Sequence, residues 1–82
     1  MKKFLYFTAP WCGPCKMLAP LMEELATELP IEKIDVDINA EMTVKYGIMT
    51  VPTVILIKDE EEVTRTVGPK PKSYYIDQYN EN

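Results

Sequence analysis

The stretch Trp11-Cys12-Gly13-Pro14-Cys15 contains the only two cysteines of this 82-residue chain and lies where a strand pattern gives way to a helical one. Two cysteines separated by two residues can form a structural disulfide, provide half of a metal site, or act as a redox pair. The residues around them, and the composition of the whole chain, decide among these three interpretations.

The segment before the cysteines predicts a strand, and the segment after them predicts a helix. Residues 4–8 are mainly aromatic and apolar, and Pro10 stops them. Pro14 suits the first turn of a helix, where a residue needs no N–H partner. We expect this helix to be kinked at Pro20 and to end at Pro30. Its apolar face recurs at helical spacing and consists of Leu18, Met22, Leu25 and Leu29.

A second strand and a short helix follow. Residues 31–38 alternate between apolar and charged side chains, which predicts a strand with one buried face. Asn39 is a good N-cap for a helix at residues 40–46, and Gly47 is suited to end that helix. The apolar members of the strand are Ile34, Val36 and Ile38.

The remaining residues predict a hairpin and a last helix. Residues 53–57 form a nearly continuous apolar run, typical of a strand buried on both faces. The charged turn at residues 58–62 connects it to residues 63–67, which alternate as its partner strand, and Gly68 ends that strand. Ser73 is expected to cap the last helix. That helix carries three inward-facing residues, Tyr75, Ile76 and Tyr79.

The elements follow the order β-α-β-α-β-β-α, which predicts an α/β fold with a four-stranded mixed sheet flanked by helices. The first β-α-β unit should form a right-handed parallel crossover. We expect a single domain spanning residues 1–82, because independent cores rarely divide below about 100 residues. The cysteines then lie at the junction between the first strand and the first helix.

Composition argues against several classes of function. The chain has 13 acidic and 9 basic residues, a net charge of −4 and no basic cluster, which argues against nucleic-acid binding. No apolar stretch approaches the ~20 residues of a membrane span. The apolar run at residues 4–9 is also shorter than the ~7–15 residues of a signal-peptide core. We therefore expect a cytoplasmic protein without membrane association, in which a persistent structural disulfide would be unusual.

A structural disulfide and a metal site both fit the cysteine pair poorly. A bridge between Cys12 and Cys15 closes a loop of very few residues, so it stabilises the fold little. Zinc needs four ligands, usually two such pairs or one pair with histidines, and the chain has no histidine. Only a site shared by two chains, or completed by carboxylates, would hold the metal. The redox interpretation is favoured over both.

The redox interpretation also has a physical basis in the position of the pair. Cys12 lies at the N-cap edge of the predicted helix, where unpaired N–H groups and the positive end of the helix dipole stabilise a thiolate. Attack on a disulfide requires a thiolate. Cys15 lies one turn further in and is less accessible, so it can attack the mixed disulfide that Cys12 forms. Neither role needs a histidine, a metal or another cofactor.

These residues resemble the thioredoxin family. Trp11-Cys12-Gly13-Pro14-Cys15-Lys16, followed by Ala19-Pro20, is similar to the active-site segment of thioredoxins. The similarity continues in Lys33-Ile34-Asp35-Val36-Asp37, in Tyr46-Gly47-Ile48 and in Val51-Pro52-Thr53. It covers nearly the whole chain, from Phe4 to Tyr79, and it implies a thioredoxin-like fold.

The resemblance also implies how a substrate is held. Pro52 should be in the cis form and face the cysteines, with the backbone of Val51 pairing with a bound peptide like an added strand. Trp11 should provide a flat platform beside the sulfurs. Gly13 and Pro14, between the cysteines, should support the same substrate surface, and Gly-Pro at these positions is similar to the reducing members of the family.

The chain departs from the thioredoxin pattern in two respects. Thioredoxins usually begin with an additional strand and helix, and only three residues precede Phe4 here. They also usually carry a buried carboxylate beneath the second cysteine, where this chain has Tyr6, although the basic partner is retained as Lys33. We expect Tyr6 to serve mainly in core packing. The pH dependence of the reaction should then lack a titration from a buried acid near neutrality.

Other residues resemble glutaredoxins. Thr8-Ala9-Pro10 before Cys12, and Thr50-Val51-Pro52, are similar to glutaredoxin signatures. Glutaredoxins typically have a basic residue at the position of Ala9 and a Gly-Gly turn with an acid after the last strand. Here that turn reads Val67-Gly68-Pro69-Lys70-Pro71, so the glutathione site is incomplete.

The favoured hypothesis is a thiol-disulfide oxidoreductase that reduces protein disulfides through Cys12 and Cys15. Tyr6 and Lys33 would tune the redox pair, and no metal is expected. Its partners would be disulfide-containing proteins and an electron donor, either a thioredoxin-reductase-type enzyme or glutathione, and the protein is expected to be a monomer. Two alternatives remain: a glutaredoxin-like enzyme recycled by glutathione, and a binding subunit that uses the fold without catalysis.

Overall fold

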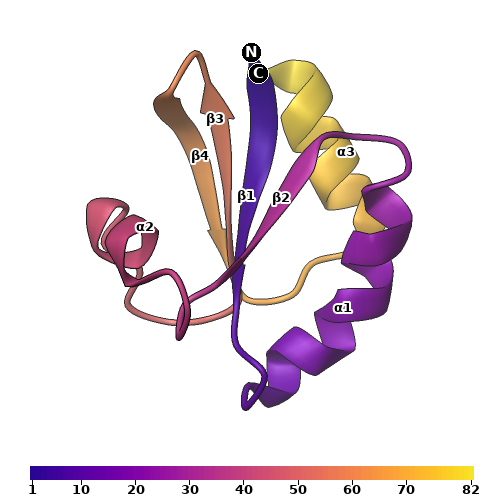
Figure 1. Cartoon of the computed structure of the whole chain (residues 1–82). Coiled ribbons are helices and arrows are strands. Elements are labelled where there is room, and N and C mark those ends of the chain that lie inside the picture. The colour runs from indigo at the N-terminus through magenta and orange to yellow at the C-terminus, as the bar shows by residue number, and fades with distance from the viewer.

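The seven predicted elements occur in the predicted order in the computed structural model, which describes all 82 residues (Figure 1). None of the three helices has the length and apolar character needed to cross a membrane. The elements are β1 (Lys2–Thr8), α1 (Gly13–Leu25), β2 (Ile31–Asp35), α2 (Ala40–Lys45), β3 (Thr53–Lys58), β4 (Glu61–Val67) and α3 (Lys72–Glu81).

The strands form the predicted four-stranded mixed sheet, and their order in it is β2-β1-β3-β4. β1 is parallel to β2, and it is antiparallel to β3, which in turn pairs antiparallel with β4. β1 is therefore a central strand. Because β1 and β2 are parallel, their carboxyl ends meet at one edge of the sheet, and α1 begins there.

The two faces of the sheet carry separate apolar cores. Successive side chains of a strand point to opposite faces, so Phe4 and Tyr6 of β1 lie under α1 and α3, whereas Leu5 and Phe7 lie on the side of α2. Figure 1 shows α1 and α3 together on one side of the sheet and α2 alone on the other. The face toward α1 and α3 buries Phe4, Tyr6, Leu18, Met22, Leu25, Val54, Leu56 and Tyr75, and the opposite face buries Leu5, Phe7, Ile34, Ile55 and Ile57.

α1 is shorter than the sequence predicts. It contains Pro20, as expected, but it ends at Leu25, well before Pro30. Beyond that point the N–H groups of Thr27 and Glu28 bond to carbonyls three residues back, and the Thr27 hydroxyl donates to the Glu24 carbonyl at 2.7 Å. This tighter turn ends the α-helix. Leu29 still packs against the core, but from the connecting segment.

The strand predicted at residues 31–38 ends at Asp35, so the expectation that Ile38 is buried was wrong. Asp35 folds the chain into a turn: its side chain accepts from the Asp37 N–H at 2.9 Å, and its carbonyl accepts from the N–H groups of Ile38 and Asn39. Ile38 is left 83% exposed. A side chain that bonds its own backbone two residues on competes with a strand in this way.

α2 has the predicted caps, and its helical residues end one position earlier than expected. The Asn39 side chain accepts from the Met42 N–H at 3.1 Å. The helix ends at Lys45 with Tyr46 as its C-cap, and Gly47 follows with a φ of +60°, a conformation that favours glycine. No residue of α2 itself is fully buried. This short helix therefore depends on few contacts for its place on the sheet.

Ser73 does not cap α3. The helix begins at Lys72 with Pro71 as its N-cap, and no side chain caps it. Pro71 is extended, with φ −63° and ψ 156°, and its carbonyl accepts from the Tyr74 N–H at 3.0 Å. Tyr75 is fully buried, as predicted, while Ile76 and Tyr79 pack against the same core from partly buried positions.

Candidate functional site

Cys12 and Cys15 form a disulfide at the start of α1, beside the carboxyl end of β1. Cys12 is the N-cap residue of the helix, with extended backbone angles of φ −88° and ψ 116°. Its Sγ accepts a hydrogen bond from the Cys15 N–H at 3.2 Å, and the two Cα atoms are 5.2 Å apart. The sulfur therefore occupies the position where a helix N-terminus binds an anion.

The surroundings of the pair favour a thiolate at Cys12. The first turn of α1 has no acidic residue that would oppose a negative sulfur. Both cysteines are nearly buried, with Cys12 5% and Cys15 2% exposed, and they pack with Ala9, Val36 and Val51. Cys12 is the more exposed of the two, by a small margin.

The segment opposite the disulfide presents an unpaired backbone. The Val51–Pro52 peptide bond is cis, as the resemblance implied, and the Val51 carbonyl oxygen lies 3.5 Å from Cys12 Sγ. Neither the N–H nor the C=O of Val51 has a backbone hydrogen bond, whereas the carbonyls of the residues on either side of it accept hydrogen bonds. The Thr50 carbonyl accepts from the Thr53 hydroxyl at 2.7 Å, and the Pro52 carbonyl accepts from the Gly68 N–H at 2.9 Å.

Trp11 lies beside the cysteines with 67% of its surface exposed, yet its orientation is fixed. Its indole Nε1 donates to a carboxylate oxygen of Asp37 at 2.8 Å. Sequence reasoning did not identify Asp37 as a site residue. The parallel pairing of β1 and β2 was the available signal, because it brings the residues after both strands to one edge of the sheet.

A groove of about 300 Å³ lies between Trp11 and the segment that leads to the cis-proline. It is mostly apolar, and Met49 on its wall is 95% exposed. No motif in the sequence marks residues 48–50 as a groove wall. The lining residues are Trp11, Val36, Thr43, Ile48, Met49, Thr50 and Val51.

Tyr6 and Lys33 lie beneath the second cysteine. Tyr6 is 3% exposed and belongs to the core, and its hydroxyl donates to the Cys15 carbonyl at 3.4 Å. Lys33 is paired with Tyr6 in the register of β1 and β2. Both residues line a pocket of about 170 Å³ that also contacts Cys15 and Asp35. The structure thus brings Tyr6, Lys33 and Cys15 together. No group of three or more His, Cys, Asp or Glu side chains could hold a metal ion.

Gly13 and Pro14 occupy the exposed first turn of α1. A Cβ atom added at Gly13 would meet no heavy atom within 4 Å. The glycine is therefore not required by packing inside this chain. Open space at this position leaves the backbone between the cysteines accessible to another molecule.

The disulfide lies at the N-cap of the helix that follows a central strand. It faces a cis-proline, and the residue before that proline makes no backbone hydrogen bond. Together these features define a thiol-disulfide oxidoreductase. The thioredoxin family model matches residues 2–81, and the chain belongs to the thioredoxin family.

Relatives and solved structures agree with this assignment. The chain is 57% identical over 70 residues to a thioredoxin of Bacillus subtilis, covering 80% of this chain and 67% of that protein. It is 46% identical over 79 residues to a thioredoxin of Chlamydia pneumoniae, covering 93% of this chain and 78% of that protein. Its fold superposes on a mutant thioredoxin from Halobacterium salinarum with a TM-score of 0.90 and 38% identity, covering 98% of this chain and 73% of that one.

The family and the Cys12–Cys15 pair together establish the class of reaction. The chain is a protein-disulfide reductase that acts through its dithiol. The two alternatives drawn from the sequence, a glutaredoxin-like enzyme and a non-catalytic binding subunit, are not favoured.

Proposed function

We propose that Cys12 is the attacking residue and Cys15 the resolving residue of this reductase. The Cys12 thiolate attacks one sulfur of a substrate disulfide, whose S–S bond breaks as a bond from that sulfur to Cys12 Sγ forms. The other substrate sulfur leaves as a thiolate and takes a proton. The Cys15 thiolate then attacks Cys12 Sγ and releases the second substrate thiol. Two electrons have passed to the substrate, and the Cys12–Cys15 disulfide remains.

The observation that carries this assignment is the position of Cys12 Sγ at the N-cap of α1, where it accepts the Cys15 N–H at 3.2 Å. A thiolate at this position is stabilised by the helix N-terminus. Cys15 lies inside the first turn and is almost fully buried, so an incoming disulfide meets Cys12 first.

We propose that substrate proteins are held in an extended conformation along Val51. Its N–H and C=O make no backbone hydrogen bond, which supports this role because they can accept a substrate segment as an added strand. Pro52 has no N–H of its own and follows directly. The remaining contact surface would come from Gly13 and Pro14, which are exposed, and from Trp11, whose ring is held in place by Asp37.

Tyr6 and Lys33 are proposed to tune the redox pair. The Tyr6 hydroxyl, bonded to the Cys15 carbonyl, occupies the position beneath the resolving cysteine without introducing a carboxylate. Lys33 provides a positive charge at the rim of the pocket that reaches Cys15. The positive charge favours a Cys15 thiolate during the resolving step.

We propose that a thioredoxin-reductase-type enzyme, rather than glutathione, returns electrons to the oxidised pair in the cytoplasm, and that the protein acts as a monomeric electron carrier without an added cofactor. Lys70 and Lys72, the two lysines at the turn before α3 and at its start, already have partners. Lys72 forms ion pairs with Glu24 at 2.9 Å and Glu28 at 2.6 Å, and Lys70 lies over the Tyr74 ring at 5.8 Å. These contacts oppose a glutathione site at the start of α3.

A coupled assay tests the donor. The oxidised protein is supplied either with NADPH and a bacterial thioredoxin reductase or with NADPH, glutathione and glutathione reductase, and NADPH consumption is followed with a disulfide-bridged peptide as substrate. We expect turnover with the first system at a rate at least about tenfold above the second. The same assay between pH 6 and pH 9 should show no titration of a buried acid near neutrality, since Tyr6 replaces the carboxylate.

Recycling by glutathione without turnover by the reductase would reverse the donor assignment. A Tyr6→Asp variant whose Cys15 reactivity is unaltered between pH 6 and pH 9 would contradict the proposed role of Tyr6. Sedimentation of the same protein sample checks the monomeric state under the assay conditions.

A further inference from the structure

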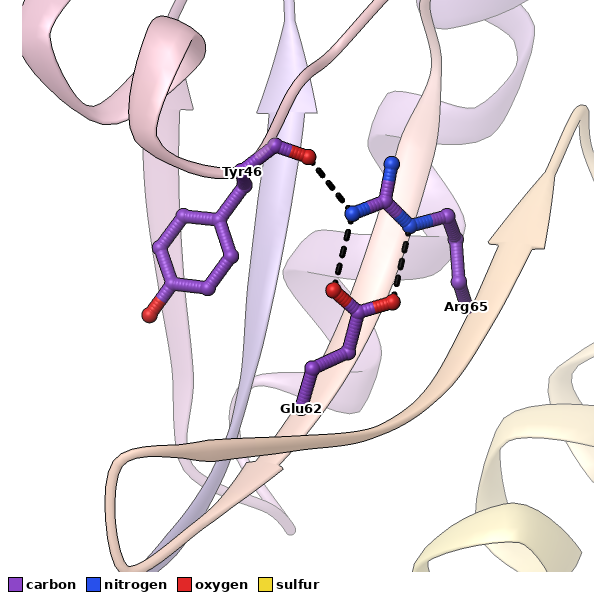
Figure 2. A network of polar contacts seen from close by, with 3 residues as sticks. All are labelled: Tyr46, Glu62 and Arg65. Carbon is purple, nitrogen blue, oxygen red and sulfur yellow. Dashed lines mark hydrogen bonds and ion pairs between the residues drawn. The ribbon is translucent and has the colours of Figure 1, made fainter.

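A charged network outside the active site joins the edge strand β4 to the end of α2 (Figure 2). Arg65 forms a two-pronged ion pair with Glu62, with Nε donating to one carboxylate oxygen at 2.9 Å and Nη2 to the other at 2.8 Å. The same Nη2 donates to the backbone carbonyl of Tyr46 at 2.6 Å. Hydrogen bonding between the two side chains lowers the pKa of Glu62 and raises the pKa of Arg65, so both stay charged.

A β-bulge makes this network possible. Residues three apart on a regular strand point to opposite faces of the sheet. In β4, however, Thr64 pairs with Leu56 and Glu62 pairs with Ile57, so Val63 is an extra residue without a partner. The bulge turns Glu62 to the same face as Arg65. Both then lie opposite residues whose side chains point toward α2, because Glu62 pairs with Ile57 and Arg65 pairs with Ile55.

The network acts on a helix that has few other attachments. α2 has no fully buried residue, and Met42 and the capping Tyr46 pack on the sheet only from partly buried positions. Among the side-chain hydrogen bonds of the structure, the bond from Arg65 to Tyr46 is the only one that joins a strand to α2 or its C-cap. Arg65 therefore supplies the polar attachment of this end of α2 to the sheet.

The end of α2 leads directly to the candidate substrate edge. After Tyr46 and Gly47, residues 48–51 form one wall of the groove beside Trp11, and Val51 presents its unpaired backbone to Cys12. Residues 46–51 are six consecutive residues without helix or strand, so a shift of the Tyr46 carbonyl at their start is expected to move Val51 at their end. Anchoring the first of these residues restricts where the last can lie.

We propose that Arg65, oriented by Glu62, is a positioning residue that holds the segment at residues 46–51 so that Val51 and the groove are ready for a peptide substrate. This inference rests on the proposed pairing of substrate with Val51. Arg65 does not touch the reacting sulfurs, and it acts through Tyr46. Its effect should therefore appear in the binding of extended peptides and much less in the attack of Cys12 on a disulfide too small to reach Val51.

The test compares variants in single-turnover reactions of the fully reduced protein, which need no donor enzyme. One substrate is a disulfide-bridged peptide and the other is the small chromogenic disulfide dithiobis-nitrobenzoate. Arg65→Gln should raise the half-saturation concentration of the peptide about fivefold and change the maximum rate less than about twofold. Arg65→Lys keeps the positive charge but cannot form the two-pronged ion pair with Glu62, so it should raise the half-saturation concentration less than Arg65→Gln does. Glu62→Gln should raise the half-saturation concentration about twofold.

Lys72→Gln is the matched control. It removes the ion pairs of a lysine of comparable exposure, with Glu24 at 2.9 Å and Glu28 at 2.6 Å, on the face of the sheet away from α2. Its peptide binding should match that of the unmodified protein. Thermal unfolding of each variant confirms that it is folded at the assay temperature.

Two outcomes would overturn the proposal: an Arg65→Gln protein with unchanged half-saturation for the peptide, or one in which reactions with both disulfides slow in parallel. A second peptide, N-methylated beside its cysteine, separates a failure of the Arg65 proposal from a failure of the proposed pairing between substrate and Val51. If N-methylation weakens binding while Arg65→Gln does not, pairing at Val51 stands and the role of Arg65 is wrong. If N-methylation has no effect, the pairing itself is wrong.

Discussion

Cys12→Ser should abolish disulfide reduction, with a loss on the order of 10³-fold or more. A serine hydroxyl at the N-cap keeps the hydrogen bond from the Cys15 N–H, so the fold is preserved while the nucleophile is lost. The measurement is the rate of thiol release from a disulfide-bridged peptide, with dithiothreitol as the reductant. Because the remaining Cys15 lies inside the first turn of α1 and not at its N-cap, it should not replace Cys12 in the attack.

Cys15→Ser is the partner variant that separates the two roles. Its Cys12 should attack once and then stall, because no second thiol is available to release the substrate. Mass spectrometry should show a covalent adduct of one protein and one substrate half, and this adduct should disappear on reduction. Accumulation of the adduct in Cys12→Ser, and not in Cys15→Ser, would show that the roles are reversed.

Tyr75→Ala should destabilise the protein by about 3–5 kcal/mol, the usual cost of removing a large aromatic side chain from a core. Tyr75 is completely buried and anchors α3 on the sheet. Its ring meets Phe4 edge-on at 6.1 Å and Tyr74 at 5.8 Å, and its hydroxyl accepts from the Lys70 N–H at 3.2 Å. Domains are stable by only about 5–15 kcal/mol, so much of the total would be lost. Urea unfolding followed by circular dichroism measures the effect.

Tyr75→Phe is the matched control, and it should cost about 1 kcal/mol because only the hydrogen bond to Lys70 is lost. Burial raises the pKa of the Tyr75 phenol above its ordinary value. The unfolded chain ionises first, so this contribution to stability is complete below about pH 10 and is lost as the pH rises through the folded-state pKa. Tyr75→Phe should show a smaller alkaline loss. A cost below about 1 kcal/mol for Tyr75→Ala would contradict the anchoring role of this ring.

Most of the fold could be predicted from the sequence because its patterns are local. The continuous apolar runs of β1 and β3 reflect burial on both faces, because the two cores each take every second side chain of these strands. Asn39 and Gly47 have short-range effects on backbone geometry, so the ends of α2 were predicted to within one residue. The redox site could also be predicted, because both cysteines and the helix N-terminus that carries them lie within one short motif.

The errors and omissions arose where side chains act over longer distances or compete with periodicity. Ile38 continued the alternation of β2, but Asp35 bonded to Asp37 and turned the chain away. The contact between Trp11 and Asp37 depends on the packing of two strands. The network of Arg65 depends on a bulge at Val63, and nothing in the charged run of β4 distinguishes the extra residue from its neighbours.

The equilibrium reduction potential of the Cys12–Cys15 couple tests the central claim most directly. The protein is equilibrated in buffers of defined dithiothreitol or glutathione potential, and the reduced fraction is read after alkylation and mass spectrometry. We expect a value of about −270 mV, because that is the potential of thioredoxins. Such a couple passes electrons to the disulfides of other proteins. A potential above about −200 mV would contradict the account, because the protein would then act as an oxidant or isomerase.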